Sequence, residues 1–167
     1  MMNLTRSGKI TGNTPYGLID NLTMTYTGNQ LIKVVDNATA PPVPDSEDFR
    51  DYTDKNGLYT YNANGAMITD SHKGILGIKY NSLNLPQELA VKNINTVGKT
   101  YYTYSAGGQK LKVVHKSSSN MNYTPVVGST SGDANYDIVA TTDYVGNMVY
   151  ENGSLKILFD GGYYEND

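Results

Sequence analysis

The sequence predicts an all-β fold in which consecutive antiparallel β-hairpins form a twisted, curved and open sheet. Three observations support this prediction: a short sequence motif recurs along the chain, tyrosine outnumbers the other aromatic residues, and Gly and Asn recur at expected turns. The chain has 15 Tyr, 2 Phe and no Trp, with 17 Gly among its 167 residues. Tyr and Thr favour half-buried strands, and Gly supplies turns that need positive φ. We therefore expect many short strands and little helix.

The clearest repeat lies between residues 57 and 111. In residues 57–67 the order Tyr-Thr-Tyr precedes a small polar turn that contains Gly65, and in residues 99–111 the same order precedes a turn that contains Gly108. A repeated unit of this size cannot bury its apolar face alone, so neighbouring units must stack against one another. The tyrosine rings are expected to pack across each hairpin, with their hydroxyl groups at the solvated margin.

Weaker copies of the same order extend over most of the chain. Residues 22–35 have a strand, a Gly/Asn turn and a second strand, and residues 78–86 have Leu83-Asn84 where the clear copies have glycine. Two more hairpins are predicted in residues 142–150 and 151–158. The second contains Asn152-Gly153, a pair that favours a tight type I′ turn.

Residues 87–92 are the one ambiguous segment among the predicted strands. Their sequence could form a single helical turn, but Leu89 and Val91 alternate equally well on one face of a strand. We predict a strand here, because the neighbouring pattern is that of hairpins.

Two loop insertions interrupt the single β domain that we predict for residues 1–167. The first, near residues 37–54, is rich in proline and then acidic, and the second, near residues 117–135, is rich in Ser, Gly and Asn. The acidic residues of the first insertion could converge on a cation: Asp45, Glu47, Asp48, Asp51 and Asp54. Their spacing does not follow an EF-hand, so we predict a solvated loop, no metal site and no cofactor.

Charge and composition disfavour several classes of function. A net charge of −3 and a pI near 5.3 give no basic surface for nucleic acid. The chain has no cysteine, which excludes disulfides and thiolate catalysis. No stretch has the apolar length of a membrane span.

Catalytic motifs are equally sparse, and we expect no enzymatic activity. His72 and His115 are the only imidazoles, and we predict that both are exposed and without a catalytic role. Residues 93–100 end in the Gly-Lys-Thr of a phosphate-binding loop, but they lead into a predicted strand where such a loop needs a helix. A glycoside hydrolase with two carboxylates across a cleft stays open as an alternative, although no acid lies in a motif that gives it a role.

The sequence motifs in residues 59–70 and 73–86 closely resemble the tyrosine-aspartate (YD) repeats of bacterial RHS proteins. The later copies of the motif look like further repeats of the same array. The resemblance spans about residues 20 to 160. In two copies Asn62 and Ser105 replace the aspartate of the repeat, so turn capping passes to weaker polar groups.

The resemblance implies long hairpin arrays that wind into a hollow shell, which often encloses a C-terminal toxin, at the cell surface or in secreted proteins. It also implies roles in intercellular competition, adhesion or carbohydrate binding. Residues 161–167 show no toxin domain and no self-cleaving aspartate segment. We therefore expect a wall segment whose partners are further repeats or other copies, joined through open sheet edges.

An alternative function for the same strands is carbohydrate binding, with exposed tyrosine rings as stacking platforms. The candidate residues are Tyr59, Tyr61, Tyr101, Tyr102 and Tyr104. Adjacent residues of a strand face opposite sides, so Tyr101 and Tyr102 cannot both belong to one platform.

Overall fold

The fold was analysed in a computed structural model that describes residues 1–11, 16–39, 49 and 57–165. The chain forms two compact units, residues 1–74 and 75–167, which we treat separately. The described part contains thirteen β-strands and one short 3₁₀ helix, η1 (Asp133–Asn135). The predicted all-β class is therefore confirmed, while the single domain expected for residues 1–167 stays a prediction.

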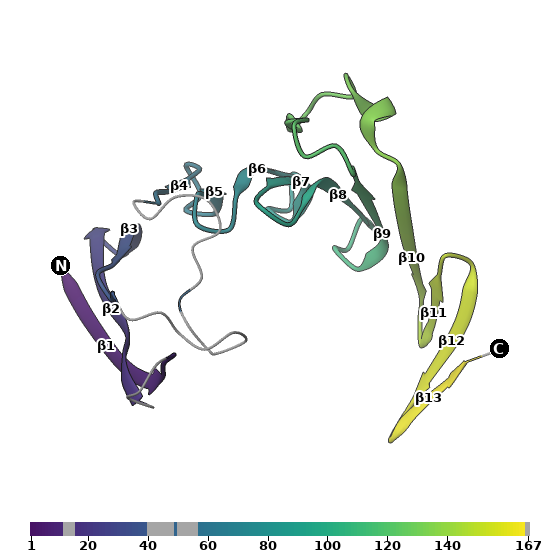
Figure 1. Ribbon diagram of the computed structural model, residues 1–167. Coiled ribbons are helices and arrows are strands. Elements are labelled where there is room, and N and C mark those ends of the chain that lie inside the picture. The colour runs from purple at the N-terminus through teal and green to yellow at the C-terminus, as the bar shows by residue number, and fades with distance from the viewer. Residues whose placement is uncertain (12–15, 40–48, 50–56, 166–167) are drawn as a thin grey trace. The chain divides into compact units, whose positions relative to one another are not determined.

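The first unit contains a three-stranded antiparallel sheet and a short hairpin, which a single bridge between Lys33 and Leu58 joins to the chain of β3. The sheet has strands β1 (Met2–Lys9), β2 (Tyr16–Thr27) and β3 (Gln30–Asp36), in that order (Figure 1). Strands β4 (Tyr59–Tyr61) and β5 (Met67–Asp70) form the hairpin. The hairpin predicted in residues 22–35 is confirmed, because β2 and β3 turn at Gly28 with a φ of 60°.

The second unit is an antiparallel sheet in which consecutive strands pair in sequence order (Figure 1). Its strands are β6 (Ile75–Tyr80), β7 (Pro86–Lys92), β8 (Val97–Tyr104), β9 (Lys110–Ser117), β10 (Ile138–Val145), β11 (Met148–Glu151), β12 (Ser154–Phe159) and β13 (Gly162–Glu165). Strand β7 confirms the predicted strand over residues 87–92. Asn152 and Gly153 have φ values of 51° and 91°, as a type I′ turn requires.

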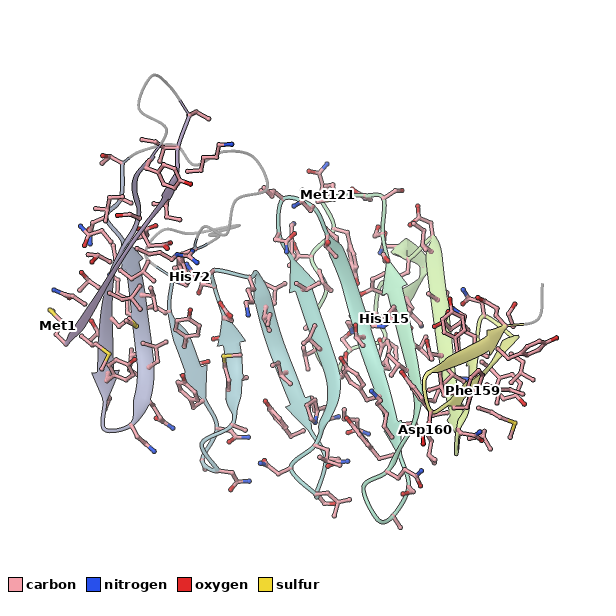
Figure 2. All side chains as sticks on the ribbon, turned by 90° about the horizontal axis from the view of Figure 1, so that it is seen from below. Met1, His72, His115, Met121, Phe159 and Asp160 are labelled. Carbon is pink, nitrogen blue, oxygen red and sulfur yellow. The ribbon has the colours of Figure 1, made fainter. Side chains whose placement is uncertain are left out.

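The prediction that His72 is exposed is wrong. It lies in the turn after β5, as its sequence suggested (labelled in Figure 2). Its side chain is buried, however, with only 2% of the residue exposed. Its ring lies 4.9 Å from that of Phe49 and 5.7 Å from that of Tyr59, and Nε2 is 3.1 Å from the carbonyl oxygen of Val34. The burial of His72 could not be predicted from the sequence, because Val34 and Phe49, which contact it, are distant from residue 72 in the chain. His115 is exposed, as predicted.

The sheet of the second unit has two chemically different faces. Residues that pair across antiparallel strands lie on the same face, and alternate residues lie on opposite faces. The pairs Ala90–Lys99 and Lys99–Lys116 define one face, which we call the strap face. The pair Tyr102–Val113 lies on the other face, which we call the tyrosine face.

Residues 118–137, which we call the strap, cover the strap face over strands β6 to β9. This segment corresponds to the second predicted insertion. Pro125 is buried, and Val127 lies so close to Gly77 that a Cβ on that glycine would be 2.8 Å from Cγ2 of the valine. The Lys116 ammonium lies 3.0 Å from the Asp133 carboxylate at the far end of the strap. The strap is thus a packed second layer over part of the sheet.

A buried ion pair holds the middle of the strap to the sheet. Lys99 Nζ lies 2.8 Å from Glu88 Oε1, and the Lys99 side chain is fully buried. The Gly128 amide donates to Glu88 Oε2 at 2.9 Å, and Lys99 Nζ donates to the carbonyl of Ser129 at 2.6 Å. Burial lowers the pKa of Lys99, but its hydrogen bond to Glu88, the negative charge of that group and the interaction with Tyr101 together outweigh burial, so the pKa is raised. Both charges are therefore compensated.

Removing one member of this ion pair should destabilise the fold more than removing both. Lys99→Met leaves the Glu88 carboxylate buried without its counter-charge, and we expect a loss of about 3–5 kcal/mol in the free energy of unfolding. The double variant Lys99→Met/Glu88→Met should recover at least half of this loss in urea unfolding. Equal losses in the single and double variants would show that the pair is not coupled in this way.

Gly98 lies where a side chain cannot fit, because an added Cβ would be 2.5 Å from the backbone carbonyl oxygen of Lys116. Gly98→Ala should therefore lower the free energy of unfolding by about 1–3 kcal/mol, as steric overpacking does elsewhere. Gly107→Ala is the matched control, since the nearest atom to its Cβ would be 3.9 Å away. If thermal unfolding gave the two variants the same stability, the close approach of β8 and β9 would be contradicted.

Candidate binding notch between two turns

Three hairpins share one bulged turn, which begins at a tyrosine. In each of these hairpins the register of strand pairing shifts by one residue at the tyrosine. The tyrosines Tyr61, Tyr80 and Tyr104 pair with Met67, Pro86 and Lys110, respectively. In each hairpin one residue of the second strand is left over, and these residues are Ile68, Gln87 and Leu111. Such bulges turn side chains away from their regular direction. The tyrosine repeat in the sequence therefore corresponds to a repeated backbone geometry.

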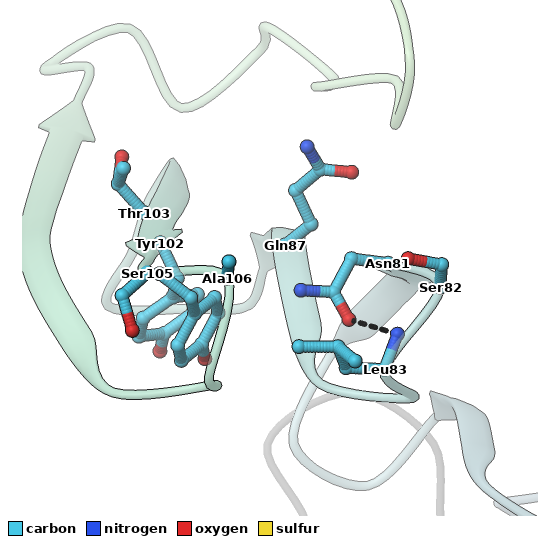
Figure 3. A pocket seen from close by; sticks show the side chains of 9 residues that line it. Asn81, Ser82, Leu83, Gln87, Tyr102, Thr103, Ser105 and Ala106 are labelled. Atoms are coloured by element: carbon cyan, nitrogen blue, oxygen red, sulfur yellow. Dashed lines mark hydrogen bonds between the residues drawn. The ribbon is translucent and has the colours of Figure 1, made fainter.

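The residue after each tyrosine caps its turn. Asn62 Oδ1 accepts from the amides of Asn64 and Ala66, at 3.0 and 2.9 Å. Asn81 Oδ1 makes the same two bonds, to Leu83 and Leu85, both at 3.0 Å (Figure 3 shows the first). In the third turn Ser105 Oγ accepts from Gln109 at 3.1 Å.

The residue three positions after each capping residue has a left-handed backbone. Gly65, Asn84 and Gly108 have φ values of 80°, 58° and 83°. Asn84 thus takes the place of glycine, as its position in the sequence indicated, because Asn tolerates this conformation better than most residues. Gly108 is also close to the preceding turn, since a Cβ there would be 3.3 Å from Leu85 Cδ1.

A notch of about 450 Å³ lies between the second and third of these turns, within the second unit. The β7–β8 ladder ends at the pair Glu88–Tyr101, so the strands separate beyond it, and Pro86 has no amide to extend the ladder. The lining residues are Asn81, Ser82, Leu83, Gln87, Tyr102, Thr103, Tyr104, Ser105 and Ala106 (Figure 3). They offer hydroxyl and amide groups beside apolar carbon, without a charged side chain.

Two predicted candidates, Tyr102 and Tyr104, form the aromatic wall of this notch. Their rings are stacked, with centroids 6.4 Å apart and planes inclined by 24° (Figure 3). Burial raises the pKa of Tyr102, and the neighbouring Tyr104 and Tyr144 raise it further; burial also raises the pKa of Tyr104. Both phenols therefore stay neutral at neutral pH. Within the described residues neither hydroxyl group has a hydrogen-bond partner, so both can serve a ligand.

The other three candidates lie elsewhere. Tyr101 faces the strap, with the ammonium groups of Lys99 and Lys116 at 5.8 and 5.4 Å from its ring centroid, so Tyr101 and Tyr102 lie on opposite faces. Tyr59 packs near His72 in the first unit, and the Tyr61 hydroxyl donates to the carbonyl of Leu31 at 2.8 Å. The structure thus brings together two of the five predicted tyrosines.

Sequence reasoning missed the polar lining of the notch. Gln87 is the bulged residue of its hairpin and is exposed, and the side-chain nitrogen of Asn81, Nδ2, has no hydrogen-bond partner in the described part of the chain. The signal for Asn81 was present, because it follows the tyrosine of its repeat copy as Asn62 does. Pro86, which has no amide to extend the ladder, is the sequence feature that could have indicated the opening beside Gln87.

Three further observations concern metal ligands, the phosphate-loop sequence and membrane spans. No group of three or more His, Asp or Glu side chains there could hold a metal ion. The acidic residues of the first insertion lie outside the described residues: Asp45, Glu47, Asp48, Asp51 and Asp54. Residues 97–104 form β8, so the Gly-Lys-Thr sequence enters a strand, as predicted. Among the described residues, no helix is long and apolar enough to span a membrane.

Comparisons with protein-family models, curated proteins and solved structures give no match for this chain. Its function is therefore argued from its own geometry.

The shared turn predicts how substitutions at its capping position behave. Asn81→Ala removes the acceptor for two backbone amides and should lower the free energy of unfolding by about 1–2 kcal/mol. Ser105→Asn should raise it by about 0.5–1 kcal/mol, because the amide oxygen can also reach the Gly107 amide, as Asn62 reaches Asn64. Ser82→Ala, at an exposed position of the same turn, should have little effect in urea unfolding. A destabilised Ser105→Asn variant would contradict the equivalence of the turns.

Proposed function

We propose that this chain is a non-enzymatic structural module of a cell-surface or secreted RHS-type repeat protein. In the parent it forms a wall segment of a β-shell that carries or encloses an effector. The observation that supports the proposal is the turn shared by three hairpins, with a tyrosine, a capping side chain after it and a left-handed residue three positions after the cap. A repeated turn that builds a sheet in sequence order is what an array of such units needs.

The last strand of the second unit can accept a further repeat. Strand β13 pairs with β12 and has no strand on its other side in the described part of the chain. An unpaired edge offers backbone donors and acceptors to another strand. Further repeats of the parent, or the edge of another copy, would satisfy these groups.

The neighbouring coding sequence and the behaviour of the purified chain test this proposal. We expect further tyrosine-marked turns beside this segment and a variable domain after them. We also expect amide hydrogen exchange in β13 to slow as the protein concentration rises, because edge pairing protects the outer amides. A gene without further repeats, together with β13 exchange that is independent of concentration, would contradict the proposal.

Carbohydrate binding is the second candidate function, and the notch is the observation that favours it. Tyr102 and Tyr104 supply aromatic carbon, while Asn81, Ser82 and Gln87 supply neutral polar groups at one margin. Sugars present apolar ring faces and hydroxyl groups, and this combination of side chains matches both. Glycoside hydrolysis gains no support here, because no Asp or Glu lines the notch.

Glycan arrays followed by calorimetry test the second candidate. If a neutral oligosaccharide binds at the notch, Tyr102→Ala should weaken its affinity by about tenfold, equivalent to about 1.4 kcal/mol. Tyr163→Ala, an exposed tyrosine on β13, is the matched control and should leave the affinity unchanged. An array without binding, or an equal loss in both variants, would exclude the notch as a sugar site.

A further inference from the structure

The last four strands of the second unit form a sheet whose two faces differ in the charge and polarity of their side chains. Lys156 lies 2.8 Å from Glu151 and 3.2 Å from Glu165, and these three residues share the tyrosine face. The opposite face continues the strap face, because Asp143 on β10 pairs with Lys112 on β9 and with Tyr150 on β11. The separation follows from strict alternation along β10 to β13.

Apart from Thr141 and Asp143 on β10, the side chains on this continuation of the strap face are apolar or aromatic. By their register they are Val145, Met148, Tyr150, Leu155, Ile157, Phe159 and Tyr164, which we call the apolar patch. Val145, Phe159 and Tyr164 are 55%, 59% and 57% exposed (Phe159 is labelled in Figure 2). Soluble proteins seldom leave a contiguous apolar surface of this kind uncovered without a use for it.

Elsewhere in the sheet the strap covers this same face. Over β6 to β9 the strap buries the face with Pro125 and Val127, whereas strands β11 to β13 contact only their ladder neighbours among the described elements. The apolar patch is thus continuous with an established packing interface but lacks its second layer in the described chain.

We propose that the apolar patch is a dimer interface, which a second copy of this chain covers with its own apolar patch. Two sheets packed face to face form a sandwich about 10 Å thick, with the side chains of both inner faces interleaved. The proposal goes beyond the structural-module function, because it concerns a face of the sheet rather than its edge.

Charges at the border of the apolar patch favour a second copy as the partner. Lys112 and Asp143 lie on the same face, 3.2 Å apart, and both side chains are about two-fifths exposed. A two-fold interface brings each surface against its own copy, so the lysine of one chain can approach the aspartate of the other. The border is therefore complementary to itself.

The available area fits a weak dimer. With three side chains more than half exposed and the rest half-buried, the patch offers roughly 500 Å² per copy, or roughly 1,000 Å² for the pair. This total lies at the low end of specific interfaces. We expect dimerisation to depend on concentration in the micromolar range or above.

Sedimentation equilibrium of the full chain tests the proposal with variants on opposite faces of the same strands. Phe159→Lys and Tyr164→Lys place a charge in the apolar patch, and each should weaken the dimer at least tenfold. Leu158→Lys and Tyr163→Lys are the matched controls, because these residues are also exposed but lie on the tyrosine face. Circular dichroism checks that all four variants keep the β fold.

Two outcomes would overturn the proposal. One is a chain that stays monomeric at all concentrations, and the other is a dimer that the tyrosine-face variants weaken as much as the patch variants do. Edge pairing is distinguished by amide exchange, since it protects the outer amides of β13, whereas face packing protects the Tyr164 ring from chemical labelling. Edge pairing and face packing can therefore be measured independently, and the absence of one does not prevent a test of the other.

Discussion

Each hairpin of this chain depends on the strands beside it, and this constraint shapes the rest of the structure. Few side chains are fully buried in either unit, and apart from the strap the second unit is built from strands that touch only their ladder neighbours. An isolated two-stranded hairpin is marginal in water. Stability must therefore come from lateral pairing, cross-strand packing of tyrosines and well-capped turns.

The turn is the part of the fold that sequence reasoning predicted best, because its determinants are local. Tyr61 and Tyr104 mark it, Asn62 and Ser105 cap it, and Asn84 replaces glycine where the backbone is left-handed. All of these contacts span at most four residues. A repeated local pattern therefore translated directly into a repeated local structure.

The parts that the sequence did not predict depend on distant contacts. His72 is buried because Phe49 and Val34 approach it, and the Glu88–Lys99 pair is buried because residues 128 and 129 of the strap lie over it. The notch exists because one ladder opens beside Gln87. Composition suggested a polar insertion between β9 and β10, but it could not show that this segment would form a second layer.

The two faces of the second unit then suggest separate uses. On the tyrosine face, stacked rings border a notch with neutral polar groups. On the strap face, a polar strap covers one part of the sheet and leaves an apolar patch on the other. A scaffold of paired hairpins can carry both surfaces, because side chains on either face leave the backbone ladder unchanged.

The central claim, that a hairpin folds only when it is flanked by its neighbours, is tested most directly with a peptide of residues 97–117. This peptide contains β8, the third bulged turn and β9, and both strands have a neighbour on their other side in the second unit. We expect NMR chemical shifts and amide exchange typical of an unfolded chain, while the same amides are protected in the full protein. A peptide with a native ladder and protected amides at 25 °C would contradict the claim.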